Sequence, residues 1–403
     1  MKKVLIEFFD EENLNNCISQ MYFEYRKAYY LRFESQKKID GIGPVFKKLD
    51  EFNRERFGAE CKFKDLKSDD PEEIIRAIEE IVSKEEGGFD FDITGGPESF
   101  AYAVRGFVER NNPKNVCVHY YDFAKKKYFR TYPKFETRET PFKRKLTVPS
   151  LIMLQASSVS NDEIPGGRQY RPGLNKNDYK ENIKTVWNCV KKKAGEWNSF
   201  CSLANINKDE KTGKFLTPDC LIIKNFGSGQ KAKIEPVLSS LEEAGVIEIK
   251  ELTSRQIKYY ITLPKEQWDL LDKGGNALEL YTYYVASTCG KYNDCCVGVH
   301  LDWDGDVKND NEEVTNEADV ILSDGYLPVF ISCKNTEVEK ACIYEILFVA
   351  RYYGGKYAKP VIFSSVKASK AIRNRTKESE IILIDDIANL TEDQFREKII
   401  NLT

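Results

Sequence analysis

Short apolar runs alternate with amphipathic segments in the first third of the chain. The runs at residues 4–9, 89–93 and 116–121 predict buried strands. Residues 71–82 carry isoleucines at helical spacing behind a proline, and residues 100–109 form a second amphipathic segment, so both predict helices. Alternation of strands and helices predicts a parallel, doubly wound α/β sheet.

The pattern changes in the middle of the chain. A Gly/Pro-rich stretch at 165–173 suggests a boundary or a mobile loop. Residues 234–244 predict a helix that ends before Gly245, and strands follow at 246–249 and 259–263. This order favours a winged-helix unit, which binds DNA in many proteins. A linking or dimerising module is an equally open interpretation.

The last third returns to mixed α/β patterning. A helix from Asn276 precedes several strands, and a long helix ends at the glycine pair 354–355. A buried strand, a basic helix and a final helix complete the unit. The chain is therefore expected to contain three domains, at 1–165, 166–264 and 265–403.

Charge and composition narrow the function. The 403 residues include 61 basic and 64 acidic side chains, a net charge of −3, so a nucleic acid must be attracted by a local patch. No apolar run approaches a membrane span and no signal peptide is evident, which predicts a soluble cytoplasmic protein without a membrane partner. The 11 cysteines form no CxxC pair, and the 2 histidines are far apart. Carboxylates, lysines and hydroxyls are left to carry any chemistry.

A glycine pair directly after the strand at 89–93 is the first candidate site. Glycines there allow close approach of a ligand, and the helix that follows offers free N–H groups to phosphate. The polar turn after the first strand would lie at the same sheet edge. A plain tight turn is the alternative. The predicted ligand-binding residues are Asp10, Asn13, Thr94, Gly95, Gly96 and Ser99.

Acidic residues around a lysine form the second candidate site. A predicted hairpin brings Ser332 and Lys334 beside Asp319, with Glu317 two residues earlier and Glu279 on the preceding helix. Carboxylates with one lysine suit a hard divalent cation, Mg²⁺ or Mn²⁺, that activates water while the ammonium stabilises a charged phosphate. A surface ion pair is the alternative.

Two other charged stretches are weaker candidates. Acidic residues between Asp302 and Glu313 imitate the spacing of an EF-hand calcium loop, but Val307 stands where that loop needs glycine. A run of lysines and arginines at 367–377 is expected to be a solvated helix face, or in a nuclease a contact to the substrate backbone.

Taken together, these residues resemble one family. The first strand with its turn and Thr94-Gly95-Gly96 resemble the CRISPR-associated Rossmann fold (CARF) sensor of cyclic oligoadenylates. Residues 316–320 and 331–334, with Glu279, are similar to the PD-(D/E)xK restriction-endonuclease-like fold. Sensor, winged helix and nuclease in this order resemble the type III CRISPR ancillary nucleases activated by cyclic tetra-adenylate.

The resemblance implies a homodimer that binds the cyclic activator at a two-fold interface and then cleaves single-stranded DNA or RNA with little sequence preference. It implies that Asp319, Glu317 and Glu279 bind metal and that Lys334 is the active-site lysine. Ser332 departs from the family pattern, which has Asp or Glu two residues before the lysine. Two other functions stay open: a ligand-controlled winged-helix transcription regulator, and an unregulated DNA repair or restriction nuclease.

Overall fold

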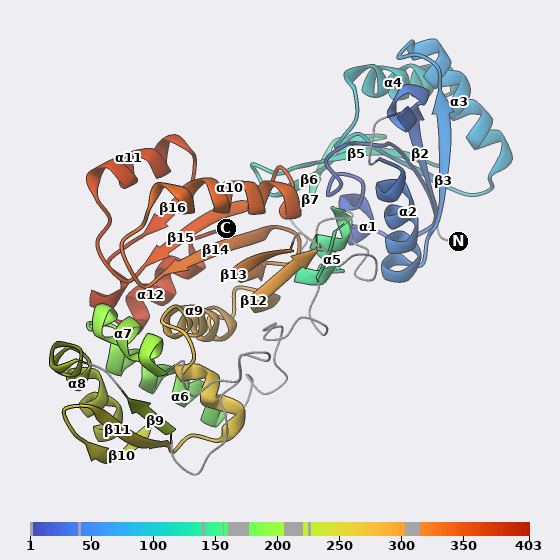
Figure 1. Cartoon of the computed structure of the whole chain (residues 1–403). Coiled ribbons are helices and arrows are strands. Elements are labelled where there is room, and N and C mark those ends of the chain that lie inside the picture. Colours follow the sequence, from blue (N-terminus) through green and yellow to red (C-terminus); the bar gives the residue numbers. More distant parts are fainter. Residues whose placement is uncertain are drawn as a thin grey trace. The chain divides into compact units, whose positions relative to one another are not determined.

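The computed structural model describes residues 3–38, 42–138, 142–155, 157–159, 177–204, 221–224, 227–302 and 315–403 (Figure 1). The chain divides into two compact units, Met1–Ser157 and Ser158–Thr403. The Gly/Pro-rich stretch and most of the EF-hand-like loop lie outside the described residues. In the described parts of the chain, no helix has the length and apolar character needed to cross a membrane.

The N-terminal unit is built on a seven-stranded sheet with the order β3-β2-β1-β4-β5-β6-β7. The first five strands along the chain pair in parallel, and β6 and β7 add antiparallel strands at one edge. The strands are β1 Lys3–Phe8, β2 Tyr25–Phe33, β3 Glu60–Leu66, β4 Phe89–Asp92, β5 Val116–Asp122, β6 Lys127–Tyr132 and β7 Glu136–Arg138. The predicted doubly wound sheet is confirmed.

Helices cover both faces of this sheet. The helices are α1 Ile18–Tyr22, α2 Ile42–Phe52, α3 Pro71–Lys84, α4 Glu98–Asn111 and α5 Val148–Leu154. The apolar faces of α3 and α4 share one core with alternate residues of the parallel strands, such as Ile6 and Phe91. On the other face, Phe46 of α2 packs edge-on against Phe9, at 4.7 Å between ring centroids. The strand order reverses between β1 and β4, which is where sheets of this type bind ligands.

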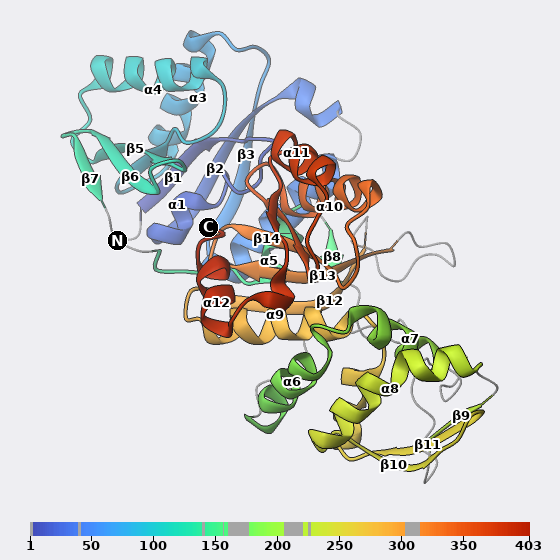
Figure 2. The ribbon, with the colours of Figure 1, turned by 90° about the vertical axis from the view of Figure 1, so that its left-hand side faces the viewer.

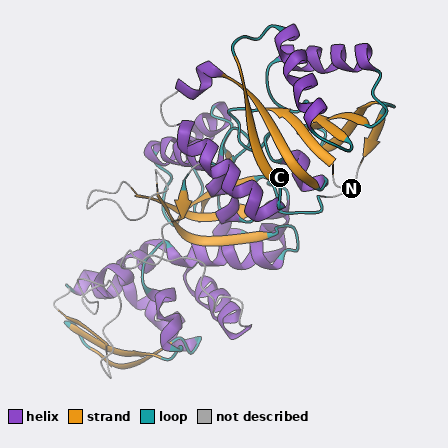
Figure 3. Ribbon diagram, turned by 90° about the vertical axis from the view of Figure 1, so that its right-hand side faces the viewer, coloured by secondary structure: helices purple, strands orange, loops and turns teal. Residues whose placement is uncertain are grey.

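The C-terminal unit contains two sheets. The larger has the order β16-β15-β14-β13-β12-β8, antiparallel from β8 to β14 and parallel from β14 to β16. Its strands are β8 Ser158–Val159, β12 Asp294–Asp302, β13 Thr315–Ser323, β14 Pro328–Lys334, β15 Lys359–Ser364 and β16 Ile382–Ile384. The smaller sheet has the order β10-β11-β9, with β9 Leu221–Lys224, β10 Ile247–Leu252 and β11 Gln256–Ile261, and Figure 3 shows it set apart from the larger one.

The helices of this unit are α6 Asn177–Val190, α7 Ala194–Ala204, α8 Ser228–Glu243, α9 Asn276–Thr288, α10 Lys340–Gly354, α11 Lys370–Glu378 and α12 Glu392–Ile400. Some of them lie between its two sheets, and α10 and α11 cover the larger sheet (Figure 2). Trp187 of α6 stacks on Tyr281 of α9, with 5.1 Å between the ring centroids. A single apolar core runs from the three-stranded sheet through α6, α7, α8, α9 and α12 to one face of the larger sheet.

The two faces of the larger sheet carry different helices. Val329, Ile331 and Cys333 of β14 share the core of α9. The alternate residue Phe330 faces α10 on the other side, because a side chain at Gly354 would come within 2.4 Å of its ring. Since strand side chains alternate, Ser332 and Lys334 lie on the α10 face.

Candidate functional site

The ends of β1 and β4 meet in a loop cluster, here called the strand-end loop and defined as residues 10–16 and 92–99. The N–H of Gly96 donates to Oδ2 of Asp10 at 2.8 Å, and the N–H of Glu12 donates to Oδ1 of the same carboxylate at 2.8 Å. Asn16 clamps the main chain of Asp10 through two hydrogen bonds of 2.8 Å. The structure therefore brings the two predicted stretches together at one sheet edge.

Glycine is required twice in this loop by the protein itself. A Cβ on Gly95 would lie 2.6 Å from Oδ2 of Asp10. Gly96 has φ = +84°, and a Cβ there would lie 2.5 Å from Cβ of Phe8. From the sequence, these glycines are interpreted as positions that allow a ligand to approach the backbone closely. In the structure, the absence of side chains on these glycines allows Asp10 and Phe8 to pack against them. The carboxylate of Asp10 accepts the hydrogen bond from the Gly96 N–H that the sequence predicts for a phosphate.

Polar side chains in the strand-end loop, among them Asn13, Asn15 and Ser99, have atoms that no protein group satisfies. Oδ1 of Asn13, Oδ1 of Asn15 and Oγ of Ser99 are buried and have no hydrogen-bond partner in the structure. By contrast, the hydroxyl oxygen of Thr94 accepts from the N–H of Tyr121 at 2.8 Å, so it ties the loop to β5. Buried polar groups without partners are costly. These atoms are therefore the ones suited to contact a bound molecule.

A row of buried polar residues crosses the sheet beneath the loop. Strand register places Tyr30, Glu7, Asp92 and His119 side by side on one face. Ser19 and Tyr128 bond to one another at 2.7 Å, Ser19 also donates to Asp92, and Tyr128 bonds to His119. Burial raises the pKa of Glu7 well above its usual range, and the charge of Asp92 adds to this. The sequence analysis did not single out this row.

The second site lies on the paired strands β13 and β14. Here Asp319, Ser332 and Lys334 form what we call the acid–lysine hairpin. Oδ2 of Asp319 accepts from the N–H of Cys333 at 2.6 Å and from the Ser332 hydroxyl at 3.4 Å. The ammonium of Lys334 lies 4.0 Å from the same oxygen. The antiparallel pairing predicted from the sequence is confirmed.

A further carboxylate, that of Glu345, affects the pKa values of the acid–lysine hairpin. Burial raises the pKa of Asp319, and although Lys334 opposes this, Glu317 and Glu345 add to it. Burial also acts to lower the pKa of Lys334, but the charge of Asp319 and further acidic groups raise it overall. Glu345 lies on α10, over the face of the sheet that carries Lys334. Sequence reasoning missed Glu345 because only the packing of α10 brings it near.

The predicted metal ligands do not converge on one point. Glu317 is exposed on β13, and Glu279 lies on α9, where its charge contributes to the raised pKa of the Cys333 thiol. Across the residues the structure describes, no three His, Cys, Asp or Glu side chains are grouped to hold an ion. The donor chemistry still fits Mg²⁺ or Mn²⁺, because Mg²⁺ is commonly held by one or two carboxylates together with water and substrate phosphate.

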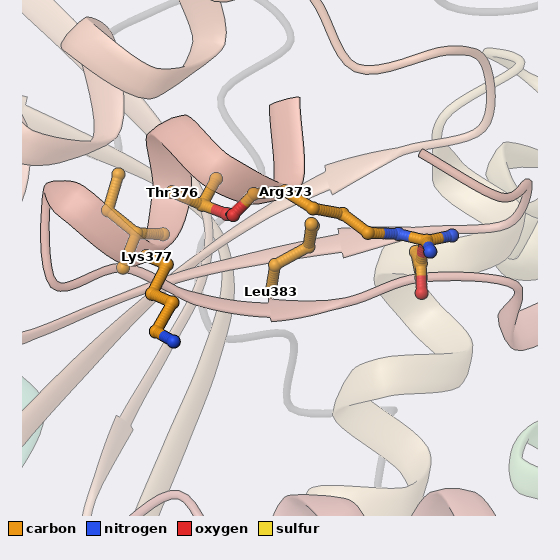
Figure 4. A pocket seen from close by; sticks show the side chains of 6 residues that line it. Arg373, Thr376, Lys377 and Leu383 are labelled. Atoms are coloured by element: carbon orange, nitrogen blue, oxygen red, sulfur yellow. The ribbon is translucent and has the colours of Figure 1, made fainter. Parts of the chain in front are cut away.

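The basic run at 367–377 lies on and before α11. Arg373, Thr376 and Lys377 line a hollow of about 300 Å³ beside β16, and Figure 4 shows Arg373 and Lys377 extending toward opposite ends of it. The guanidinium of Arg373 pairs with Asp385 at 2.9 Å, so this hollow has little net charge. Lys367, Lys370 and Arg375 are exposed instead.

Fold and sites together define a class of two-unit α/β protein. A doubly wound sheet with a polar strand-end loop is joined to a mixed sheet with an acid–lysine hairpin. Several solved structures match this fold, and among them are two that match it over the whole chain. Protein VC1899 from Vibrio cholerae matches with a TM-score of 0.75 and 13% identity, covering 100% of this chain and 99% of that one.

The second match is the structure of Can2 from Sulfobacillus thermosulfidooxidans in complex with cyclic tetra-adenylate. It has a TM-score of 0.67 and 15% identity, and covers 99% of this chain and 98% of that one. No family model and no curated protein matches the sequence. The likeness confirms, at the level of the fold, the resemblance predicted from the sequence.

Proposed function

We propose that this chain is a nuclease of type III CRISPR defence that cyclic tetra-adenylate activates. One observation carries the proposal: the acid–lysine hairpin occurs in a chain whose full-length fold is shared with a protein crystallised with cyclic tetra-adenylate. The substrate is single-stranded DNA or RNA, cleaved at its phosphodiester bonds with little sequence preference.

The N-terminal unit is the sensor in this proposal. The strand-end loop lies where the strand order reverses, and the unsatisfied atoms of Asn13 and Ser99 offer partners to a polar ligand. Asp10, Thr94 and the glycine pair hold these atoms in place. A ring of four adenosines can share the two-fold symmetry of a homodimer, so we propose that two sensors bind one activator.

The acid–lysine hairpin is the proposed catalytic site. Lys334 would stabilise negative charge on the phosphate during the reaction. Asp319 would hold a divalent cation, with Glu317, Glu279 or Glu345 supplying further charge from nearby. When bound, Mg²⁺ or Mn²⁺ supplies a water of lowered pKa and neutralises phosphate charge. The raised pKa of Asp319 fits this role, because burial disfavours an uncompensated negative charge that a bound cation would neutralise.

The central elements fit a winged helix used for structure. The order β9, α8, β10, β11 with a three-stranded antiparallel sheet supports the interpretation as a winged helix. Its apolar residues belong to the same core as α9 and the larger sheet. We propose that this unit supports the catalytic sheet, because its core is continuous with that of the sheet.

The decisive experiment is a cleavage assay on labelled single-stranded RNA, single-stranded DNA and duplex. Each substrate is incubated with Mg²⁺, Mn²⁺, Ca²⁺ or EDTA, with and without cyclic tetra-adenylate. We expect cleavage of single strands only when both activator and Mg²⁺ or Mn²⁺ are present. Cyclic hexa-adenylate and linear tetra-adenylate are the matched controls for the activator.

Other results would select another function. Cleavage at the same rate without activator would point to an unregulated repair or restriction nuclease. Tight binding of duplex DNA without cleavage, changed by the activator, would point to a transcription regulator. Either outcome would overturn the proposal.

A further inference from the structure

Two large aromatic side chains are exposed one turn apart on α10. Tyr344 is 55% exposed and Phe348 is 46% exposed. The ring of Phe348 stacks on that of Tyr352 a turn further along, with centroids 5.8 Å apart and an interplanar angle of 18°. We call Tyr344, Phe348 and Tyr352 the aromatic face. Only five large hydrophobic side chains are exposed in the described parts of the chain, and two of them are here.

The aromatic face begins beside the acid–lysine hairpin. Helix α10 begins six residues after Lys334 and lies over the face of the sheet that carries Lys334. Glu345, the neighbour of Tyr344, acts electrostatically on both Asp319 and Lys334. Cys342, on the same first turns of α10, also acts on Lys334. A chain lying along the exposed side of α10 would therefore pass directly by the proposed catalytic groups.

The segment that carries the aromatic face is rich in basic residues. Residues 340–378, from the start of α10 to the end of α11, contain nine lysines and arginines and two glutamates, in a protein whose net charge is −3. Nη1 of Arg375 donates to the hydroxyl of Tyr344 at 2.6 Å, so a guanidinium lies against the aromatic face. Arg351 is exposed one turn beyond Phe348.

We propose that the aromatic face binds unpaired bases of a single-stranded nucleic acid, with Arg375 and Arg351 contacting its phosphates. This inference rests on the proposed nuclease function and specifies its substrate. Aromatic side chains in a basic groove are the usual means of binding single strands, because every base has a face that can stack. A duplex offers no free base faces, since its bases already stack on each other.

A second copy of this chain is a less suitable occupant. A two-fold contact would place the same patch opposite itself, so Arg351 and Arg375 of the two copies would come close together and repel. A polyanion removes this repulsion. The charge around Tyr344 and Phe348 therefore favours nucleic acid over self-association.

The test measures binding without cleavage. The full chain carrying Asp319→Asn is titrated into a fluorescent oligothymidylate, an abasic strand of equal charge, and a duplex, and anisotropy is recorded. Tyr344→Ala and Phe348→Ala should each weaken binding of the oligothymidylate about tenfold. Binding of the abasic strand should stay unchanged. Equal losses on both strands, or none on either, would overturn the inference.

Conservative variants serve as controls. The Tyr344→Phe variant keeps the ring and loses only the hydrogen bond from Arg375. It should therefore bind the oligothymidylate nearly as tightly as the chain with Tyr344 does. Tyr102→Ala removes an aromatic that is 69% exposed on α4 of the other unit and should change nothing. A shift of the Phe348→Ala variant from dimer to monomer in light scattering, with unaltered oligonucleotide binding, would assign the face to self-association and overturn the inference.

The binding assay also separates this inference from the proposed function. Suppose that the unmodified chain cleaves only with activator but the alanine variants bind and cleave normally. Then the role assigned to the aromatic face is wrong, and the nuclease proposal stands. If the chain never cleaves, yet loses the oligothymidylate in both alanine variants, the face binds single strands and the nuclease proposal fails.

Discussion

Both candidate sites contain polar side chains on or next to strands. The two sites differ in how many of these polar groups are hydrogen-bonded within the protein. In the strand-end loop, both oxygens of Asp10 accept main-chain N–H groups, and the glycines close around them. In the acid–lysine hairpin, Asp319 has one short bond from Cys333, while Lys334 stays 4.0 Å away. The carboxylate of Asp10 is therefore fully used in holding the loop together. The carboxylate of Asp319 is not, and its burial raises its pKa.

This difference separates residues that hold a site from residues that act in it. Groups that the protein satisfies should contribute to stability, because their removal leaves partners unpaired. Groups that it leaves underpaired should contribute to binding or catalysis, and their removal should cost little stability. The following predictions test that division.

The largest effect is expected at Lys334. Lys334→Ala removes the ammonium that would stabilise charge on the phosphate, so activator-dependent cleavage should fall about 10²–10³-fold. Melting temperature and activator affinity should hardly change. Lys398→Ala, an exposed lysine on α12, is the control and should cleave normally. Turnover near that of the unmodified chain would remove the hairpin from the active site.

Asp319→Asn should reduce cleavage about as strongly as Lys334→Ala and yet stabilise the protein at neutral pH. The folded pKa of Asp319 is above its usual value, mainly because the carboxyl is buried, so ionising it costs stability as pH rises through that pKa. The cost vanishes at low pH, where the carboxyl is protonated in both states. The gain in melting temperature should therefore be larger at pH 7 than near pH 4, and Mn²⁺ should rescue cleavage poorly. A lower melting temperature at pH 7 would contradict this.

Gly96→Ala should unfold or loosen the N-terminal unit. The new methyl group would collide with Phe8 and would require a backbone conformation with φ = +84°, which together cost several kcal/mol, about 1–3 for overpacking and about 1–2 for the conformation. Gly43→Ala is the matched control, because nothing lies within 4 Å of its added Cβ. Urea unfolding measures both variants. Equal midpoints would show that the glycine serves the ligand alone.

Much of the fold could be predicted from local patterns. The strands at 89–93 and 116–121 and the final helix, which begins at the capping pair Thr391 and Gln394, are confirmed because each depends on neighbouring residues. Strand β2 was not predicted because charged residues interrupt its apolar pattern. Its Lys27 lies 2.6 Å from Glu85, and its Arg32 lies 2.8 Å from Asp65. These partners are distant in sequence, so no local signal reveals them.

In the candidate sites too, features that depend on neighbouring residues were predicted and features that depend on distant segments were not. Alternation along β14 sufficed to place Ser332 and Lys334 on one face, and the short turn brought them to Asp319. Glu345 depends on how α10 packs, and the row that includes Glu7 and His119 depends on the register of parallel strands. Packing and register between distant segments leave no trace in a local pattern.

Asn13 belongs with the underpaired groups. Its Oδ1 is buried without a partner, so Asn13→Ala should leave the melting temperature of the free protein nearly unchanged. Affinity for cyclic tetra-adenylate, measured by calorimetry, should fall about two- to tenfold, the value of one hydrogen bond. Asn16→Ala is the opposite case, because its amide clamps Asp10, and it should lower the melting temperature. A loss of stability in Asn13→Ala with unchanged affinity would reverse the assignment.

The smallest effect is expected at Ser332, where the family pattern has a carboxylate. Its hydroxyl is 3.4 Å from Oδ2 of Asp319, a long and weak hydrogen bond, whereas the N–H of Cys333 holds the same oxygen at 2.6 Å. Ser332→Ala should therefore leave Asp319 in place and reduce cleavage less than about tenfold, since it removes at most one weak bond. Ser332→Asp offers the contrasting variant, because a second carboxylate would strengthen binding of a divalent cation and lower the Mn²⁺ concentration needed for half-maximal cleavage. If Ser332→Ala is as inactive as Lys334→Ala, the hydroxyl itself acts in the reaction, and the hairpin is more completely assembled than its distances indicate.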